Sequence, residues 1–178
     1  MSEAANATIE GVGVRVEASL EAGADRPVRV RYRVQNTGGA DLAVFDRGNR
    51  HAVLTKRQQT GDVGEPGFHE DDDGGLVLSH VARPLPDPSP TLPPTPLAAR
   101  LAPGQALEGS FSFSPLVGDQ PRRLRWCLGV APFDDKQFRS PEQADGVEVW
   151  QASFALADSQ QKLCTPWFDV AAGTFQAE

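Results

Sequence analysis

The feature that most constrains this chain is a strict alternation of apolar and polar side chains in residues 28–34. Successive side chains of a β-strand point to opposite faces, so this pattern indicates an antiparallel strand with one buried and one solvent-exposed face. The apolar members are Val28, Val30, Tyr32 and Val34, and the polar members are Arg29, Arg31 and Arg33. Gly and Pro together make up 32 of the 178 residues, which argues against a coiled coil or a helical bundle.

The same alternation recurs and predicts further strands at residues 12–20, 42–45, 51–56, 75–83, 107–113, 122–130 and 146–156. Residues 167–170 are expected to form a last strand or a packed coil, and residues 158–163 a short helical turn. Between the strands we expect a polar, acidic loop at 57–75 and a long loop at 133–145. Residues 84–96 hold seven of the fifteen prolines, which predicts an extended, polyproline-like loop.

Many short strands separated by turns predict an all-β fold, specifically a two-sheet antiparallel sandwich with long irregular loops. A chain of 178 residues suits a single domain spanning 1–178. In this interpretation, 57–75 and 84–96 are excursions from the sandwich, and 158–178 is a C-terminal extension packed on it.

Charge and hydropathy exclude several classes of protein. A net charge of −7 argues against nucleic-acid binding. Membrane insertion is not expected, because no apolar run approaches the ~20 residues that a spanning helix needs. The N-terminus as written lacks a signal peptide and predicts a cytoplasmic protein, or a periplasmic or secreted one if a signal peptide has been removed.

Several segments together resemble bacterial immunoglobulin-like domains. They are Val30–Gly38 with its Val-Gln-Asn-Thr-Gly end, Leu42–Phe45, the Leu101–Gly104 turn and Gly109–Phe113. The outline is also similar to the intracellular proteinase inhibitor family of bacilli. The resemblance covers residues 12–130. It implies a two-sheet antiparallel immunoglobulin-like sandwich, and for the second family a protease inhibitor acting through an exposed loop; no functional residue is carried over.

The chain has two cysteines, Cys127 and Cys164, which are too few for a four-cysteine zinc site and too far apart for a thioredoxin-like motif. Two alternatives stay open, a disulfide or two unlinked thiols. A disulfide would close a loop of ~38 residues and stabilise the fold by roughly 4 kcal/mol in the chain-entropy model.

Candidate metal ligands are the three histidines, His51, His69 and His80, together with Asp71 and Asp73 of the acidic run. Their spacing matches no helix or strand metal motif, so metal binding or a hydrolase using the histidines is an alternative rather than the leading function. The sequence contains no Gly-x-Ser-x-Gly nucleophile elbow and no phosphate-binding glycine loop. We therefore expect no cofactor and no enzymatic activity.

Two features are candidates for partner binding. The row Arg29, Arg31 and Arg33 forms a linear positive stripe that could meet an acidic partner segment, or the chain's own acidic loop. Pro88 and Pro90 mark the proline-rich loop, whose preformed extended shape loses little entropy on docking. The leading hypothesis is a non-catalytic protein-binding or accessory domain that displays loops 57–75 and 84–96 to a protein partner. Its oligomeric state is left open.

Overall fold

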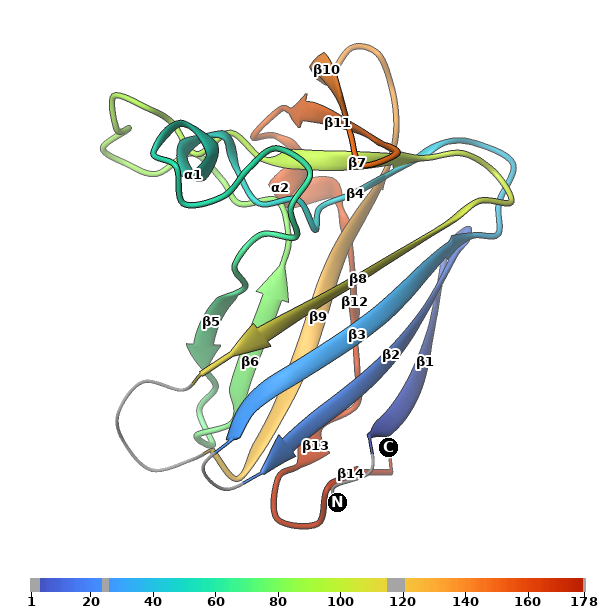
Figure 1. Ribbon diagram of the computed structural model, residues 1–178, viewed down its shortest axis with the longest axis vertical. Coiled ribbons are helices and arrows are strands. Elements are labelled where there is room, and N and C mark those ends of the chain that lie inside the picture. Colours follow the sequence, from blue (N-terminus) through green and yellow to red (C-terminus); the bar gives the residue numbers. More distant parts are fainter. Residues whose placement is uncertain (1–3, 24–25, 115–120, 178) are drawn as a thin grey trace.

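The structure, a computed structural model, describes residues 4–23, 26–114 and 121–177. In these residues the chain forms two β-sheets, and every strand pair is antiparallel except β6 with β9. The smaller sheet, called sheet A, contains in spatial order β1 (Ala5–Gly11), β2 (Val14–Gly23), β3 (Arg26–Asn36) and β8 (Ala106–Phe113). Its long strands cross β9 of the other sheet (Figure 1).

The larger sheet, called sheet B, is strongly curved and is organised around β9 (Arg123–Pro132). Along its main path lie β10 (Phe138–Ala144), β11 (Val147–Ala152), β7 (Leu97–Leu101), β4 (Leu42–Val44), β9, β13 (Phe168–Asp169) and β14 (Thr174–Phe175). β9 also pairs with β12 (Gln161–Cys164) and with β6 (Leu76–His80), which carries β5 (Gly67–Glu70). The all-β prediction is confirmed.

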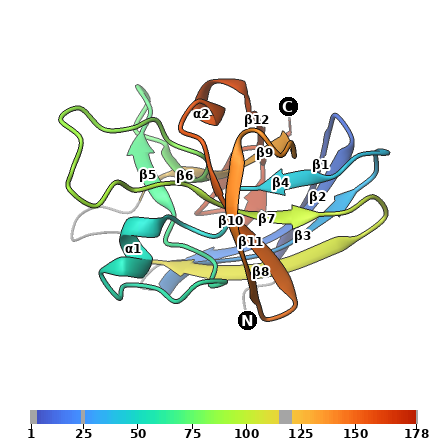
Figure 2. The same ribbon diagram turned by 90° about the horizontal axis from the view of Figure 1, so that it is seen from above.

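The helices are short. α1 (Arg50–Leu54) and α2 (Leu156–Ser159) lie in connections of sheet B. Seen from above, α1 lies at the same end of the molecule as β5, β6 and the proline-rich loop (Figure 2). In the described residues, no helix is long and apolar enough to cross a membrane.

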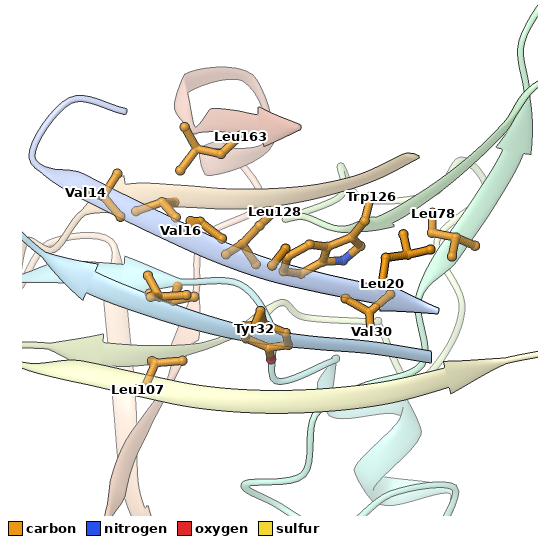
Figure 3. Close-up of a cluster of buried hydrophobic side chains, with 14 of the residues drawn as sticks. Val14, Val16, Leu20, Val30, Tyr32, Leu78, Leu107, Trp126, Leu128 and Leu163 are labelled. Atoms are coloured by element: carbon orange, nitrogen blue, oxygen red, sulfur yellow. The ribbon is translucent and has the colours of Figure 1, made fainter. Parts of the chain in front are cut away.

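The main core lies between the two sheets and follows the alternation read from the sequence. In β3 the apolar side chains are buried and the three arginines are exposed, as predicted. Trp126 of β9 is fully buried and contacts the Tyr32 ring, with 4.8 Å between the ring centroids. Figure 3 shows these two rings surrounded by aliphatic side chains from both sheets. Burial of this apolar surface is the main favourable term for the fold.

A disulfide joins Cys127 to Cys164, which face each other directly in the β9–β12 register. This settles the alternative that the sequence left open. The bond fastens the C-terminal extension, through β12, to the central strand of sheet B. Cys127 and Trp126 are neighbours on β9 and point to opposite faces, as the alternation predicted.

Two predictions of local structure are wrong, one near residue 50 and one at the start of the predicted 12–20 strand. Residues 51–56 do not form a strand but lie largely in α1, because the Asn49 side-chain oxygen accepts the Ala52 N–H at 2.9 Å and caps the helix. Val12, the first residue of the predicted 12–20 strand, lies instead in the turn between β1 and β2, where Gly13 has a positive φ of 72°, and is 85% exposed.

The expected loops also contain strands. Residues 133–145 include β10, which pairs with β11, and residues 57–75 include β5, which pairs with β6. The helical turn expected at 158–163 lies earlier, as α2, which has no side-chain cap, and residues 161–163 belong instead to the strand β12. One strand of sheet A, β1, was not predicted, although its half-buried apolar residues Ala5, Ala7 and Ile9 alternate with exposed polar ones.

Candidate functional site

The arginine row lies on the outer face of sheet A, on its third strand. Arg29, Arg31 and Arg33 are exposed, and the residues between them are buried, so the guanidinium groups extend into solvent from one face. The prediction of an exposed positive row is therefore confirmed in its geometry.

Neighbouring strands place acidic side chains beside two of these arginines. Glu21 of β2 faces Arg29 in the register, and Arg33 stands between Glu17 of β2 and Glu108 of β8. The Arg33 Nε and Glu108 Oε1 atoms are 3.9 Å apart. Pairs at such exposed positions contribute little to stability, so these charges remain available to other groups.

Arg31 has different neighbours. It faces Ser19 of β2 and Ser110 of β8, and within the described residues it forms no ion pair. The short hydroxyl side chains leave a shallow, open hollow of about 750 Å³ around Arg31. Its polar lining also includes Asn6, Thr8, Glu17, Arg33 and Glu108. Arg31 thus presents hydrogen-bond donors and a positive charge in the middle of a surface of small polar groups.

The acidic loop does not meet the arginine row but contacts β9 of sheet B. Asp71 and Asp73 carboxylates lie 3.0 and 3.3 Å from Arg123 Nη2. The Asp71 side chain also accepts the Gly75 N–H at 2.6 Å, which holds the turn between β5 and β6. Arg123 and Arg125 both stack on the Trp167 ring, at 4.1 and 4.3 Å from its centroid. These contacts give Asp71 and Asp73 a role in fastening the β5–β6 hairpin.

The histidines lie in three different settings. His51 of α1 has its Nδ1 atom 2.8 Å from the Leu92 carbonyl oxygen, His69 of β5 is exposed, and His80 of β6 is buried. Among the described residues, no group of three or more His, Cys, Asp or Glu side chains has the geometry to hold a metal ion. The structure therefore does not bring the predicted metal ligands together.

A buried polar cluster, which sequence reasoning missed, links the two sheets. The Tyr32 hydroxyl of β3 donates to Asp46 Oδ2 at 2.6 Å, and Asp46 follows β4. Arg47 Nε donates to Asp46 Oδ1 at 3.0 Å, so the buried carboxylate is paired and hydrogen-bonded. Burial, with the nearby Asp46 carboxylate, raises the pKa of Tyr32 far above its ordinary value. A Cβ atom at Gly109 would overlap the Tyr32 hydroxyl, so glycine is needed there.

His80 extends this cluster toward Trp126. The Trp126 indole N–H donates to His80 Nδ1 at 2.9 Å, so the other ring nitrogen carries the proton and donates to the Gly64 carbonyl oxygen at 2.7 Å. Burial lowers the pKa of His80 and keeps the ring neutral. Arg47 also donates to the Gly61 carbonyl oxygen, so the cluster holds the 57–66 segment against the core.

The residue in the sequence that could have indicated this cluster is Tyr32 itself. It is a polar-tipped side chain at a buried position among valines, and a buried hydroxyl needs a partner. Its partner Asp46 lies next to the predicted 42–45 strand, but sequence alone does not show that the two strands face each other.

The proline-rich loop is exposed, with Pro88 and Pro90 both on the surface. Its ends are held: the Gln160 side chain bonds the backbone of Ala82 in both directions, and Asn49 forms a β-bridge with Pro96. His51 contacts the loop at Leu92, whose side chain is 42% exposed. The loop is therefore a fastened, exposed segment.

A scan against protein-family models matches no family, and searches of the curated proteins and of the solved structures find no match either. The class of the chain is given by its architecture, an all-β protein of two sheets with a disulfide in the larger one.

Proposed function

We propose that this chain is a non-catalytic protein-binding domain of the immunoglobulin-like sandwich type, which binds an acidic segment of a partner through the outer face of sheet A. The observation that carries the proposal is the position of Arg31, which stands in an open hollow between Ser19 and Ser110. A carboxylate placed there gains charge-assisted hydrogen bonds from the guanidinium group.

The charge distribution on this face favours Arg31 as the contact point. Arg15 is paired with Glu10, and Arg29 and Arg33 have acidic residues opposite them in the register. An incoming carboxylate would meet a directly opposite acidic residue at Arg29 and at Arg33, whereas at Arg31 it would meet the serines Ser19 and Ser110. The specificity of the contact therefore depends on one central arginine, with the other charges setting the position of the partner.

The shape of the face supports a protein partner. The hollow is wide and open, whereas sites for small molecules are typically enclosed. The 57–66 segment, by contrast, is held to the core by the buried cluster around Asp46. Sheet A is thus a better candidate surface than that loop.

The disulfide supports an oxidising compartment as the place where the domain works. Disulfides persist in the periplasm and outside cells, and are rare in the cytosol of mesophiles. We therefore expect an envelope or secreted binding domain.

The test of the proposal measures, by fluorescence anisotropy, how a labelled peptide binds to the full chain. In this peptide glutamates alternate with glycines. The glutamate peptide should bind, and a lysine peptide of the same design should not. Arg31→Glu should weaken binding about tenfold, equivalent to ~1.4 kcal/mol, because it reverses the central charge.

Arg139→Glu is the matched control, since Arg139 is an exposed arginine of β10 in sheet B. It should leave the affinity unchanged. The proposal fails if the glutamate peptide does not bind, or if the two arginine variants weaken its binding equally.

A further inference from the structure

One edge of β8 is free, and it takes no part in the arginine contact proposed above. β8 is the last strand of sheet A, and its pairing is with β3. In the described part of the chain, no backbone hydrogen bond connects its other edge to another segment. An open edge of eight residues presents a row of backbone donors and acceptors that pairs readily with another strand.

An apolar strip lies below this edge, on the core side. Phe111 and Phe113 of β8 are only partly buried. Phe68 of β5 is 51% exposed, and its ring lies 5.2 Å from that of Phe113. Figures 1 and 2 show β5 and β6 at the same side of the molecule as the C-terminal end of β8. The strip would be covered by apolar side chains of a strand added to β8.

The outer side of the edge has an ordered charge pattern. Along β8 the exposed polar residues are Glu108, Ser110 and Ser112, and behind the two serines on β3 stand Arg31 and Arg29. An added strand would lie two strands, about 10 Å, from β3. Because serine is short, a glutamate opposite Ser110 or Ser112 can meet an arginine across it. A glutamate opposite Glu108 would be repelled, and a lysine there would be attracted.

We propose that β8 accepts an extended segment of a protein partner as a fifth strand of sheet A, antiparallel to β8. This rests on the proposed function and specifies how the partner binds. The segment alternates apolar with charged residues: the apolar ones pack on Phe68, Phe111 and Phe113. The charged ones are acidic opposite Ser112 and Ser110 and basic opposite Glu108.

An isolated segment fits this edge better than a second copy of the chain. The β5–β6 hairpin already occupies the layer of sheet B beside the end of β8. If a second copy of the chain continued sheet A beyond β8, its own larger sheet would have to occupy the space that the β5–β6 hairpin fills. A single added strand does not need that space and would rest on Phe68.

The test uses the full chain and the heptapeptide Val-Glu-Val-Glu-Val-Lys-Val, labelled and capped at both ends. Two further peptide series have the same sequence and carry backbone N-methyl groups, on the valines in one series and on the charged residues in the other. Only alternate residues of an added strand bond to β8, so one series should bind at least tenfold more weakly than the other. A peptide with the charge order reversed, Val-Lys-Val-Glu-Val-Glu-Val, should also bind more weakly than the original.

Phe68→Ser should weaken binding of the heptapeptide, whereas Leu92→Ser, at a comparably exposed apolar residue of the proline-rich loop, should not. Circular dichroism checks that both variants are folded.

Equal affinity for the two N-methylated series would overturn strand addition. If Arg31→Glu still weakened binding in that case, the arginine contact of the proposed function would stand. If neither this heptapeptide nor the glutamate–glycine peptide bound, both proposals would fail.

Discussion

At the scale of single residues, the buried cluster shows how one polar atom determines its surroundings. Tyr32 occupies a core position by alternation, and its hydroxyl needs an acceptor. Asp46 supplies that acceptor, and Arg47 balances the charge. The sequence therefore predicted that Tyr32 is buried. It could not predict the partner, because the contact joins two sheets.

His80 gives a residue-scale prediction of pH dependence. Burial is the main cause that lowers its pKa. The hydrogen bond to Gly64 and the charge of Asp46 act in the opposite direction, and the charge of Arg83 lowers the pKa further. The unfolded chain binds a proton near pH 6.5, whereas folded His80 does so only at lower pH. Its stabilising contribution is thus full above pH 6.5 and is lost as the pH falls toward the folded pKa. The free energy of unfolding should decrease in this window, by at most ~1.4 kcal/mol per pH unit from this group.

Urea unfolding of the full chain at several pH values between 7.5 and 5 measures this effect. His80→Phe should show a smaller decrease over that range, and His69→Gln, which changes an exposed histidine, should keep the original decrease. An unchanged pH dependence in His80→Phe would show that His80 does not titrate as described.

At the scale of elements, the sequence predicts strands well where one face is buried and the other exposed. β3 and β8 show the full alternation, and both were predicted. α1 was missed because five residues carry too little periodicity, and its decisive signal is the cap at Asn49. β10 was missed because nearly all of its side chains are exposed. Such a strand is stabilised by pairing with β11, which a local pattern does not reveal.

The disulfide gives the element-scale prediction, because it fastens β12 to β9. The cysteines are separated by 37 residues, and loss of the bond should lower the free energy of unfolding by roughly 4 kcal/mol in the chain-entropy model. The double variant Cys127→Ala/Cys164→Ala should show this loss in denaturant unfolding. Adding a reductant should destabilise the original chain similarly and leave the double variant unaffected. Equal stability of the original chain with and without reductant would contradict the prediction.

At the scale of the whole molecule, the candidate site could be predicted only in part. Alternation alone identified the three exposed arginines of β3. What distinguishes Arg31 comes from its neighbours, Ser19 and Ser110, and the second lies 79 residues further along the chain. Pairing over such distances is set by the packing of the two sheets, so the hollow and the open edge of β8 became visible only in the fold.

The measurement that tests the central claim most directly is an NMR titration of the ¹⁵N-labelled full chain with the heptapeptide Val-Glu-Val-Glu-Val-Lys-Val. The account predicts that the amide signals that move most belong to β8 and β3, with Arg31 and Ser110 among them, and that the signals of β10 and β11 stay in place. The account would be contradicted if no signals moved, or if the shifts lay on sheet B or the proline-rich loop.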